Sequence, residues 1–265
     1  MKILTKIDSG FINEPHIDWT ATENREKMRQ ALVAVKNDWG KEYPMMIDGR
    51  EYFGRDTLPS FDPACLRDIL GIIYTDERFV SIAAYAAKTA SSDWNELSAI
   101  KRGEILLKAA EIMVSRKFEL ASWIVYEVSK PWDEAMGEIE EAIDFTRLYA
   151  LVAKEYGEKT WRQPKVRSEN NYTKYAPRGI TAAISSWNFP FSLLIEKIAS
   201  SLAAGCPVLV KPAEQSPITG WHAVKCFLEA GVPAGVIAYV PGGAKVGEAL
   251  VRLGEVTQIT FTGSK

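Results

Sequence analysis

The sequence predicts an α/β protein, in which a helical amino-terminal portion precedes a parallel sheet with helices on both faces. Between residues 76 and 156, apolar side chains recur at the three- and four-residue spacing of amphipathic helices. After residue 172, short β-rich apolar runs alternate with helical stretches. Such alternation favours right-handed crossovers and a parallel sheet. With 265 residues, 47% of them hydrophobic, the chain can bury a sizeable core.

Residues 1–60 are predicted to form an amino-terminal extension that wraps on the rest of the protein. Proline, glycine and aspartate are scattered through it, and it is expected to be irregular apart from one helix, Glu23 to Asp38. The apolar residues that define this helix are Met28, Ala31, Leu32 and Val35.

Residues 61–172 are predicted to be the helical part of the main domain. Polar and proline-containing segments divide this part into four predicted helices: Asp76 to Ala90, Ser98 to Arg116, Phe118 to Val128, and Trp132 to Glu155. The polar run Ser91 to Asp93 is expected to end the first helix, and Pro131 to end the third. The apolar stripes of these helices are interpreted as core packing.

Residues 173–265 are predicted to form the parallel sheet. The expected strands are Ile180 to Ser185, Val208 to Val210, Val236 to Val240 and Thr257 to Phe261. The expected helices are Phe191 to Ala204, Pro217 to Ala230 and Ala244 to Leu253, the first two closed by Gly205 and Gly231. Ligands of such sheets bind at the carboxyl ends of the strands. The loops of interest are therefore 186–190, 211–216, 241–244 and 262–265.

Composition excludes several classes of function. Acidic and basic residues nearly cancel, 34 against 32, so no broad positive field attracts nucleic acid. The amino terminus does not resemble a signal peptide and no apolar run reaches the length of about 18 that a membrane span needs, so we expect a soluble, cytoplasmic protein. The cysteines (65, 206 and 226) and the two histidines (16 and 222) lack metal-ligand spacing, so no metal site is expected.

Two of the loops carry side chains with possible chemistry. In Ser186 to Pro190, the amide of Asn188 could donate a hydrogen bond to an oxyanion, or it could simply satisfy the backbone of a turn. In the next loop, Lys211 and Glu214 lie three residues apart and could bind a ribose, although a solvated surface pair is an equal explanation.

The other two loops are rich in small residues. Gly242, Gly243 and Gly247 would let a diphosphate approach a helix amino terminus, yet they depart from the GxGxxG pattern and could be turn glycines. The run from Phe261 to Ser264 similarly suits phosphate contact or an ordinary turn.

Taken together, these segments resemble the aldehyde dehydrogenase superfamily in order and spacing. The matching segments are Ser-Trp-Asn-Phe-Pro at 186–190, Val-Lys-Pro-Ala-Glu-Gln-Ser-Pro at 210–217, Ala-Gly-Val-Pro-Ala-Gly-Val at 230–236 and Phe-Thr-Gly-Ser at 261–264. The 1-pyrroline-5-carboxylate dehydrogenase branch is the most similar, through residues 13–18, 130–135 and 141–145. The resemblance implies a Rossmann-like sheet and oxidation of L-glutamate γ-semialdehyde to L-glutamate with NAD+, in proline or arginine catabolism.

The resemblance also implies roles for individual residues. Asn188 would donate its amide to the oxyanion of the thiohemiacetal. Lys211 and Glu214 would hold the adenosine ribose, and Ser264 would contact the diphosphate. Because Glu214 would accept hydrogen bonds from the ribose hydroxyls and repel a 2′-phosphate, NAD is expected to be preferred, with NADP possible.

Further residues are assigned to the walls of the same cleft. Ser185, Ser186 and Trp187 would line it near the nicotinamide, while Gly243 and Gly247 would pack near the adenine. Relatives often have proline before the tryptophan, and Ser186 in its place is expected to loosen the turn slightly.

Glu127 would lie near the aldehyde tunnel, although a solvated acid at a helix end explains that residue more simply.

The nucleophilic cysteine and the water-activating glutamate of this superfamily follow the Phe-Thr-Gly-Ser segment. The sequence ends at Lys265, so the catalytic domain is expected to be missing and the chain to be an inactive fragment of a homo-oligomeric enzyme. The three cysteines present are interpreted as structural. Two alternatives remain: a dehydrogenase of another aliphatic aldehyde, and a non-catalytic nucleotide-binding protein on the same fold.

Overall fold

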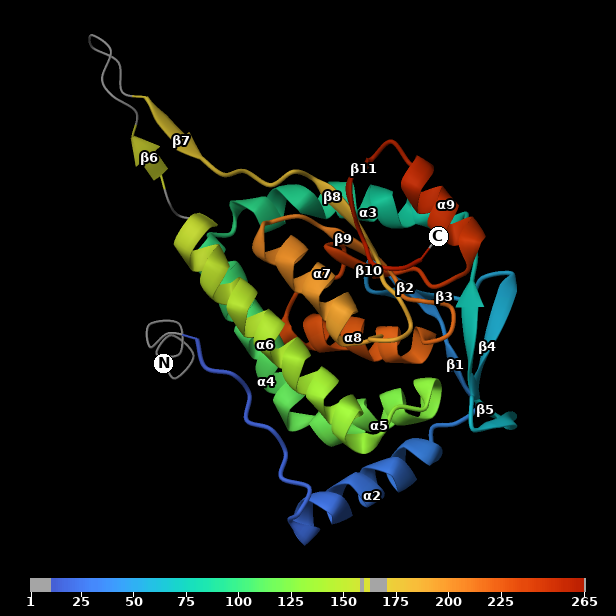
Figure 1. Cartoon of the computed structure of the whole chain (residues 1–265). Helices are drawn as coiled ribbons and strands as arrows, with labels where there is room; N and C mark the ends of the chain where they lie inside the picture. The colour runs from blue at the N-terminus through green and yellow to red at the C-terminus, as the bar shows by residue number, and fades with distance from the viewer. Residues whose placement is uncertain (1–10, 158–159, 163–170, 265) are drawn as a thin grey trace.

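A computed structural model describes residues 11–157, 160–162 and 171–264 (Figure 1). It contains a helical layer, a six-stranded sheet, a separate three-stranded sheet and a two-stranded hairpin. Among the described helices, none combines the length and apolar character that crossing a membrane requires.

The helical layer follows the predicted order. The helices of this part of the chain are α2 (Thr22–Lys36), α3 (Phe79–Glu96), α4 (Ala99–Ser115), α5 (Lys117–Val128) and α6 (Trp132–Gly157). The layer is made by α2, α4, α5 and α6, which pack on one another, whereas α3 packs against the six-stranded sheet. The prediction that the first main helix ends at Ala90 is wrong, because α3 continues through the polar run to Glu96. The fully buried Trp94 explains this, since its indole packs into the core one turn beyond the predicted end.

The four predicted parallel strands are confirmed. They are β8 (Ile180–Ile184), β9 (Val208–Lys211), β10 (Ile237–Tyr239) and β11 (Val256–Phe261), in the spatial order β11-β8-β9-β10. Val208 and Val210 of β9 join one core cluster and Leu209 joins the other, as expected for a strand buried on both faces. The helices α7 (Ser192–Ala203) and α8 (Pro217–Ala230) contact this sheet, and so do α3 and α9 (Ala244–Arg252).

The direction of the connections reverses within this sheet. From β8 the chain moves through α7 and α8 to β9 and β10, and it then returns through α9 to β11 on the opposite side of β8. A crossover of constant hand places α9 on the opposite face from α7 and α8. The point between β8 and β11 is thus a topological switch, where open α/β sheets bind ligands.

The expectation that residues 39–60 are irregular is wrong. The segment contains β1 (Lys41–Tyr43), β2 (Met45–Ile47), β3 (Arg50–Tyr52) and most of β4 (Asp56–Asp62), which pairs with β5 (Cys65–Thr75). β2 pairs antiparallel with β10 and β3 with β2, so they extend the main sheet, while β1, β5 and β4 form the separate one. Asp48 and Gly49, with φ of 50° and 72°, form the turn between β2 and β3.

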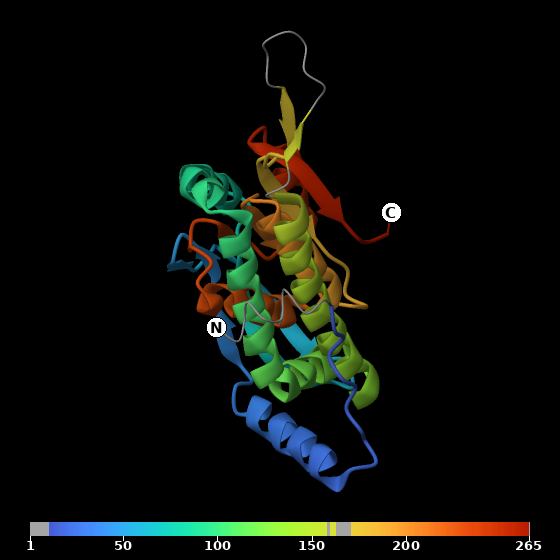
Figure 2. The same ribbon diagram turned by 90° about the vertical axis from the view of Figure 1, so that its left-hand side faces the viewer.

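The boundary placed at residue 60 falls within β4. The division into three segments remains a prediction. A further hairpin, β6 (Thr160–Arg162) with β7 (Tyr172–Lys174), projects from the body of the molecule (Figure 2).

Candidate functional site

An open cleft of about 1210 Å³ lies at the carboxyl ends of β8 and β9, between α9 and β11. Nine of the ten residues proposed from the sequence line it, and only Glu127 does not. The nine are Ser185, Ser186, Trp187, Asn188, Lys211, Glu214, Gly243, Gly247 and Ser264. The strand ends therefore bring together loops that are separated by up to 79 residues in the sequence, from 185 to 264.

Lys211 and Glu214 occupy different environments within the cleft. Lys211 is buried, and its Nζ donates to the carbonyl oxygen of Pro212 at 3.1 Å. Burial lowers the pKa of the Lys211 ammonium group, while the charge of Glu214 opposes that shift. Glu214 is exposed at the cleft. The interpretation of these residues as a solvated surface pair is therefore wrong for Lys211, whose position at the end of a buried strand removes it from solvent.

The glycines of the next loop keep the cleft open beside these side chains. A Cβ atom at Gly243 would lie 2.6 Å from Glu214 Oε2, and one at Gly247 would lie 3.4 Å from Lys211 Cε. Gly243 is the N-cap of α9 and supplies no side-chain cap, so the first turn of this helix presents backbone N–H groups at the cleft. The two glycines thus leave room for a ligand at a helix amino terminus.

The turn after β8 presents Asn188 at the other end of the cleft. The Ser186 hydroxyl donates to Asn188 Oδ1 at 2.7 Å, which holds the amide oxygen and turns Nδ2 the other way. Proline could not make this bond, so Ser186 adds a restraint where loosening was expected. Ser185 Oγ is buried in the cleft wall and has no hydrogen-bond partner among the described residues.

Glu127 lies outside the cleft and is not a solvated acid. It is only 2% exposed, because α5 packs against α8 and β4. Its carboxylate accepts hydrogen bonds from the Ser60 hydroxyl at 2.9 Å and from the backbone N–H groups of Ile218 and Thr219 at 2.8 and 2.7 Å. Burial raises its pKa to about 7. The residue caps the amino terminus of α8.

Glu138 was missed by the sequence reasoning. Its side chain is fully buried, and Oε1 accepts from the N–H groups of Phe191 and Ser192 at 2.6 and 3.1 Å, at the start of α7. Burial raises its pKa, and the ammonium group of Lys130 opposes the rise. The available signal was an acid three residues after Ala135 and next to Ile139, both on the apolar stripe of α6.

None of the three cysteines lines the cleft. Cys206 and Cys226 are buried, and Cys65 is partly exposed on β5. Burial raises the pKa of the Cys226 thiol to about 12, which suppresses the reactive thiolate. These environments agree with structural roles.

Comparison with known proteins supports the resemblance seen in the motifs. Residues 52–265 match the aldehyde dehydrogenase family. The chain is 36% identical to the 1-pyrroline-5-carboxylate dehydrogenase of Oceanobacillus iheyensis over 96% of this chain and 50% of that protein. It is 37% identical to the enzyme of the same name from Staphylococcus saprophyticus, over 97% of this chain and 50% of the relative. The chain thus spans about half the length of the curated relatives it matches.

Solved structures of related enzymes have the same fold as this chain. A 1-pyrroline-5-carboxylate dehydrogenase from Thermus with bound NAD superposes with a TM-score of 0.91 at 34% identity, over 94% of this chain and 49% of that one. Proline utilization A from Bdellovibrio bacteriovorus gives a TM-score of 0.93 at 36% identity, over 96% of this chain and 27% of that one. The α/β fold is the one found in the amino-terminal part of the Thermus enzyme. With the family match extending from residue 52 to the last residue, the chain belongs to the aldehyde dehydrogenase family.

Proposed function

We propose that this chain supplies the NAD-binding cleft and the oxyanion donor of a 1-pyrroline-5-carboxylate dehydrogenase, which oxidises L-glutamate γ-semialdehyde to L-glutamate. The observation that carries the proposal is the meeting of Asn188, Lys211 and Glu214 in one cleft at the switch point of the sheet. The names of the relatives support the choice of substrate, and the Thermus relative with bound NAD supports the cofactor.

The residues of the cleft fit a dinucleotide. Gly243 leaves room beside the Glu214 carboxylate, where a Cβ would collide, and the amino terminus of α9 offers N–H groups to a diphosphate. Ser185 adds a buried hydroxyl that lacks a partner among the described residues. Lys211 and Glu214 would donate to and accept from ribose hydroxyls. When bound, NAD+ supplies the acceptor for the hydride of the aldehyde.

Asn188 would stabilise the oxyanion that forms when a nucleophile attacks the aldehyde. Its amide is a neutral donor at the rim of the cleft, held through its oxygen by Ser186. The nucleophile is expected outside the described residues, because none of the cysteines lies in this cleft. We therefore expect this chain to bind the dinucleotide without forming NADH from an aldehyde.

Dinucleotide binding is tested by titrating NAD+ and NADP+ into the chain in a calorimeter. We expect a Kd for NAD+ between about 1 µM and 1 mM. Glu214→Ala should weaken NAD+ binding about tenfold, since it removes a charged acceptor. It should also reduce the preference of the cleft for NAD+ over NADP+. Glu255→Ala is the matched control, because Glu255 is exposed and lies outside the cleft. No NAD+ binding at several millimolar would refute the proposed cleft.

The substrate is tested on the product of the complete reading frame. L-Glutamate γ-semialdehyde should give a higher kcat/KM than unbranched aliphatic aldehydes of the same length, measured by NADH absorbance. Equal values for both would assign the protein to a dehydrogenase of general aliphatic aldehydes.

A further inference from the structure

The turn that carries Asn188 is exposed in its middle and fixed at its ends. Trp187 is 54% exposed and Phe189 is 42% exposed, whereas Ser185 and Phe191 on either side are buried. An exposed turn of this kind needs restraints from outside itself if it is to hold an amide donor in one place. Hydrogen bonds to an oxyanion require donors within about 2.7–3.1 Å of the oxygen.

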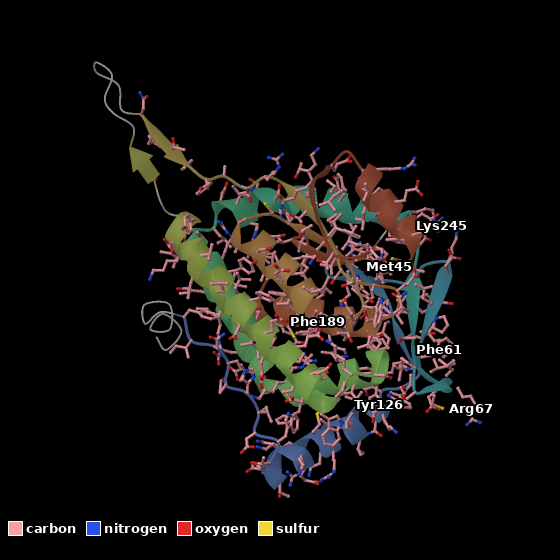
Figure 3. The ribbon with its side chains drawn as sticks, in the orientation of Figure 1. Met45, Phe61, Arg67, Tyr126, Phe189 and Lys245 are labelled. Atoms are coloured by element: carbon pink, nitrogen blue, oxygen red, sulfur yellow. The ribbon has the colours of Figure 1, made fainter. Side chains whose placement is uncertain are left out.

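One restraint comes from Lys130, between α5 and α6. Its Nζ lies 3.6 Å from the centroid of the Phe189 ring, directly after Asn188, in a cation–π contact. The side chain of Phe189 is labelled in Figure 3. The lysine is itself restrained by its neighbours: Ser129 adopts a left-handed conformation with φ of 55°, and Pro131 follows. Its side chain is mostly buried, with 12% exposed.

The same ammonium group is paired with Glu138, whose other oxygen holds the start of α7. Lys130 Nζ donates to Glu138 Oε2 at 2.6 Å, while Oε1 accepts from the N–H groups of Phe191 and Ser192. The two oxygens of one carboxylate therefore connect the lysine to the backbone just beyond the turn. Lys130 reaches the turn in two ways, through the ring of Phe189 and through Glu138.

We propose that Lys130 is a positioning residue for Asn188, acting through Phe189 and Glu138. The proposal rests on the function proposed above for Asn188, because positioning matters to the reaction only if that amide is the oxyanion donor. Ser186 fixes the amide oxygen from the strand side, and Lys130 fixes the turn from the helix side. The alternative is that the Lys130–Glu138 pair stabilises the fold without affecting the amide.

The first test measures the amide in this chain by NMR. The side-chain NH₂ signals of Asn188 are assigned by their loss in Asn188→Asp. The double variant Lys130→Met with Glu138→Gln removes both charges without stranding either, and Phe189→Leu removes the ring while keeping the pair. We expect both variants to shift or broaden the Asn188 signals, and Lys130→Arg to retain them. Unchanged signals in both variants would overturn the proposal.

A matched control comes from the same helix. Arg147 of α6 donates to the largely buried Glu14 at 2.8 Å, away from the cleft. The variant Arg147→Met with Glu14→Gln removes this charge pair, together with the 3.4 Å contact of Lys117 with Glu14, and should leave the Asn188 signals in place. If it alters them as strongly as the Lys130 variant does, the effect reflects general loosening and the proposal is wrong.

The second test measures the reaction in the product of the complete reading frame. Phe189→Leu and the Lys130/Glu138 double variant should lower kcat about tenfold while KM for NAD+ stays within about twofold, because a misplaced donor affects the transition state. Lys130→Arg should restore most of kcat. If Asn188→Ala leaves kcat unchanged, the proposed function of Asn188 fails, while the NMR result still decides whether Lys130 positions it. A loss confined to KM would overturn the proposal for Lys130.

Discussion

The amino termini of α7 and α8 are built alike but paired differently. Each helix follows a strand that ends at the cleft, and each receives a buried glutamate from the helical layer: Glu138 from α6 and Glu127 from α5. Both carboxylates accept from two backbone N–H groups. Glu138 also has the ammonium group of Lys130 at 2.6 Å, whereas Glu127 accepts from the hydroxyl of Ser60 at 2.9 Å.

Because of this difference in partners, Glu138 forms a charge pair, whereas Glu127 is a group that titrates. Burial raises the pKa of both acids, but only at Glu138 does a bonded cation oppose it. The pKa of Glu127 reaches about 7, so its charge changes near neutral pH. Similar helix capping therefore gives a pH-dependent anchor at α8 and a cation-supported one at α7, next to Asn188.

The largest effect is expected from Lys130→Met. The substitution leaves the Glu138 carboxylate buried without its cation, which should lower the free energy of unfolding by about 3–5 kcal/mol. Urea denaturation at pH 8 measures it. Adding Glu138→Gln should recover most of the loss, because no charge is then stranded. A loss below about 1 kcal/mol in the single variant would show that the lysine does not support this anchor.

The next effect is a pH dependence at Glu127. Its folded pKa of about 7 lies above the ordinary value of 4.5, so the folded state keeps this proton while the unfolded state loses it. The contribution to stability is complete below about pH 4.5 and is lost as the pH rises to about 7. The free energy of unfolding should fall by about 3 kcal/mol over that window from this group.

Glu127→Gln isolates that contribution, because the amide oxygen can still accept from one of the two helix N–H groups and the side chain does not titrate. Urea denaturation of both proteins between pH 4.5 and 7.5 should show the decline relative to the variant. Parallel curves for the two proteins would mean that Glu127 does not titrate in this window.

A smaller effect is expected from Ser60→Ala. The hydroxyl donates to Glu127 at 2.9 Å, and a hydrogen bond to an ionised group contributes about 2 kcal/mol against about 1 kcal/mol for a neutral one. The loss should therefore be about 2 kcal/mol at pH 8 and about half of that at pH 5, by urea denaturation. A loss that is the same at both pH values would argue against an ionised Glu127 at pH 8.

The sequence predicted the sheet well where local signals were strong. Helix α8 begins at Pro217 and is closed by Gly231, as predicted. Proline favours the first turn of a helix, and glycine adopts the left-handed conformation that ends it, here with φ of 102°. It failed for all five strands between residues 41 and 75, of which β1, β2 and β3 are three residues long and too short to show a period. The Asp48–Gly49 pair was the usable signal there, because that dipeptide favours the tight hairpin turn observed.

From residue 180 onward, the sequence by itself determined the order of strands and helices and the residues at the strand ends, because periodicity and turn chemistry are local properties. Together with the resemblance to the aldehyde dehydrogenase superfamily, that information predicted nine residues of one cleft. Only the tertiary structure decided the partners of Glu127 and Glu138, which contact backbone groups 91 and 53 residues away. Helical spacing places an acid on a face of its helix. What lies above that face, a helix amino terminus with or without a lysine, depends on how distant segments pack.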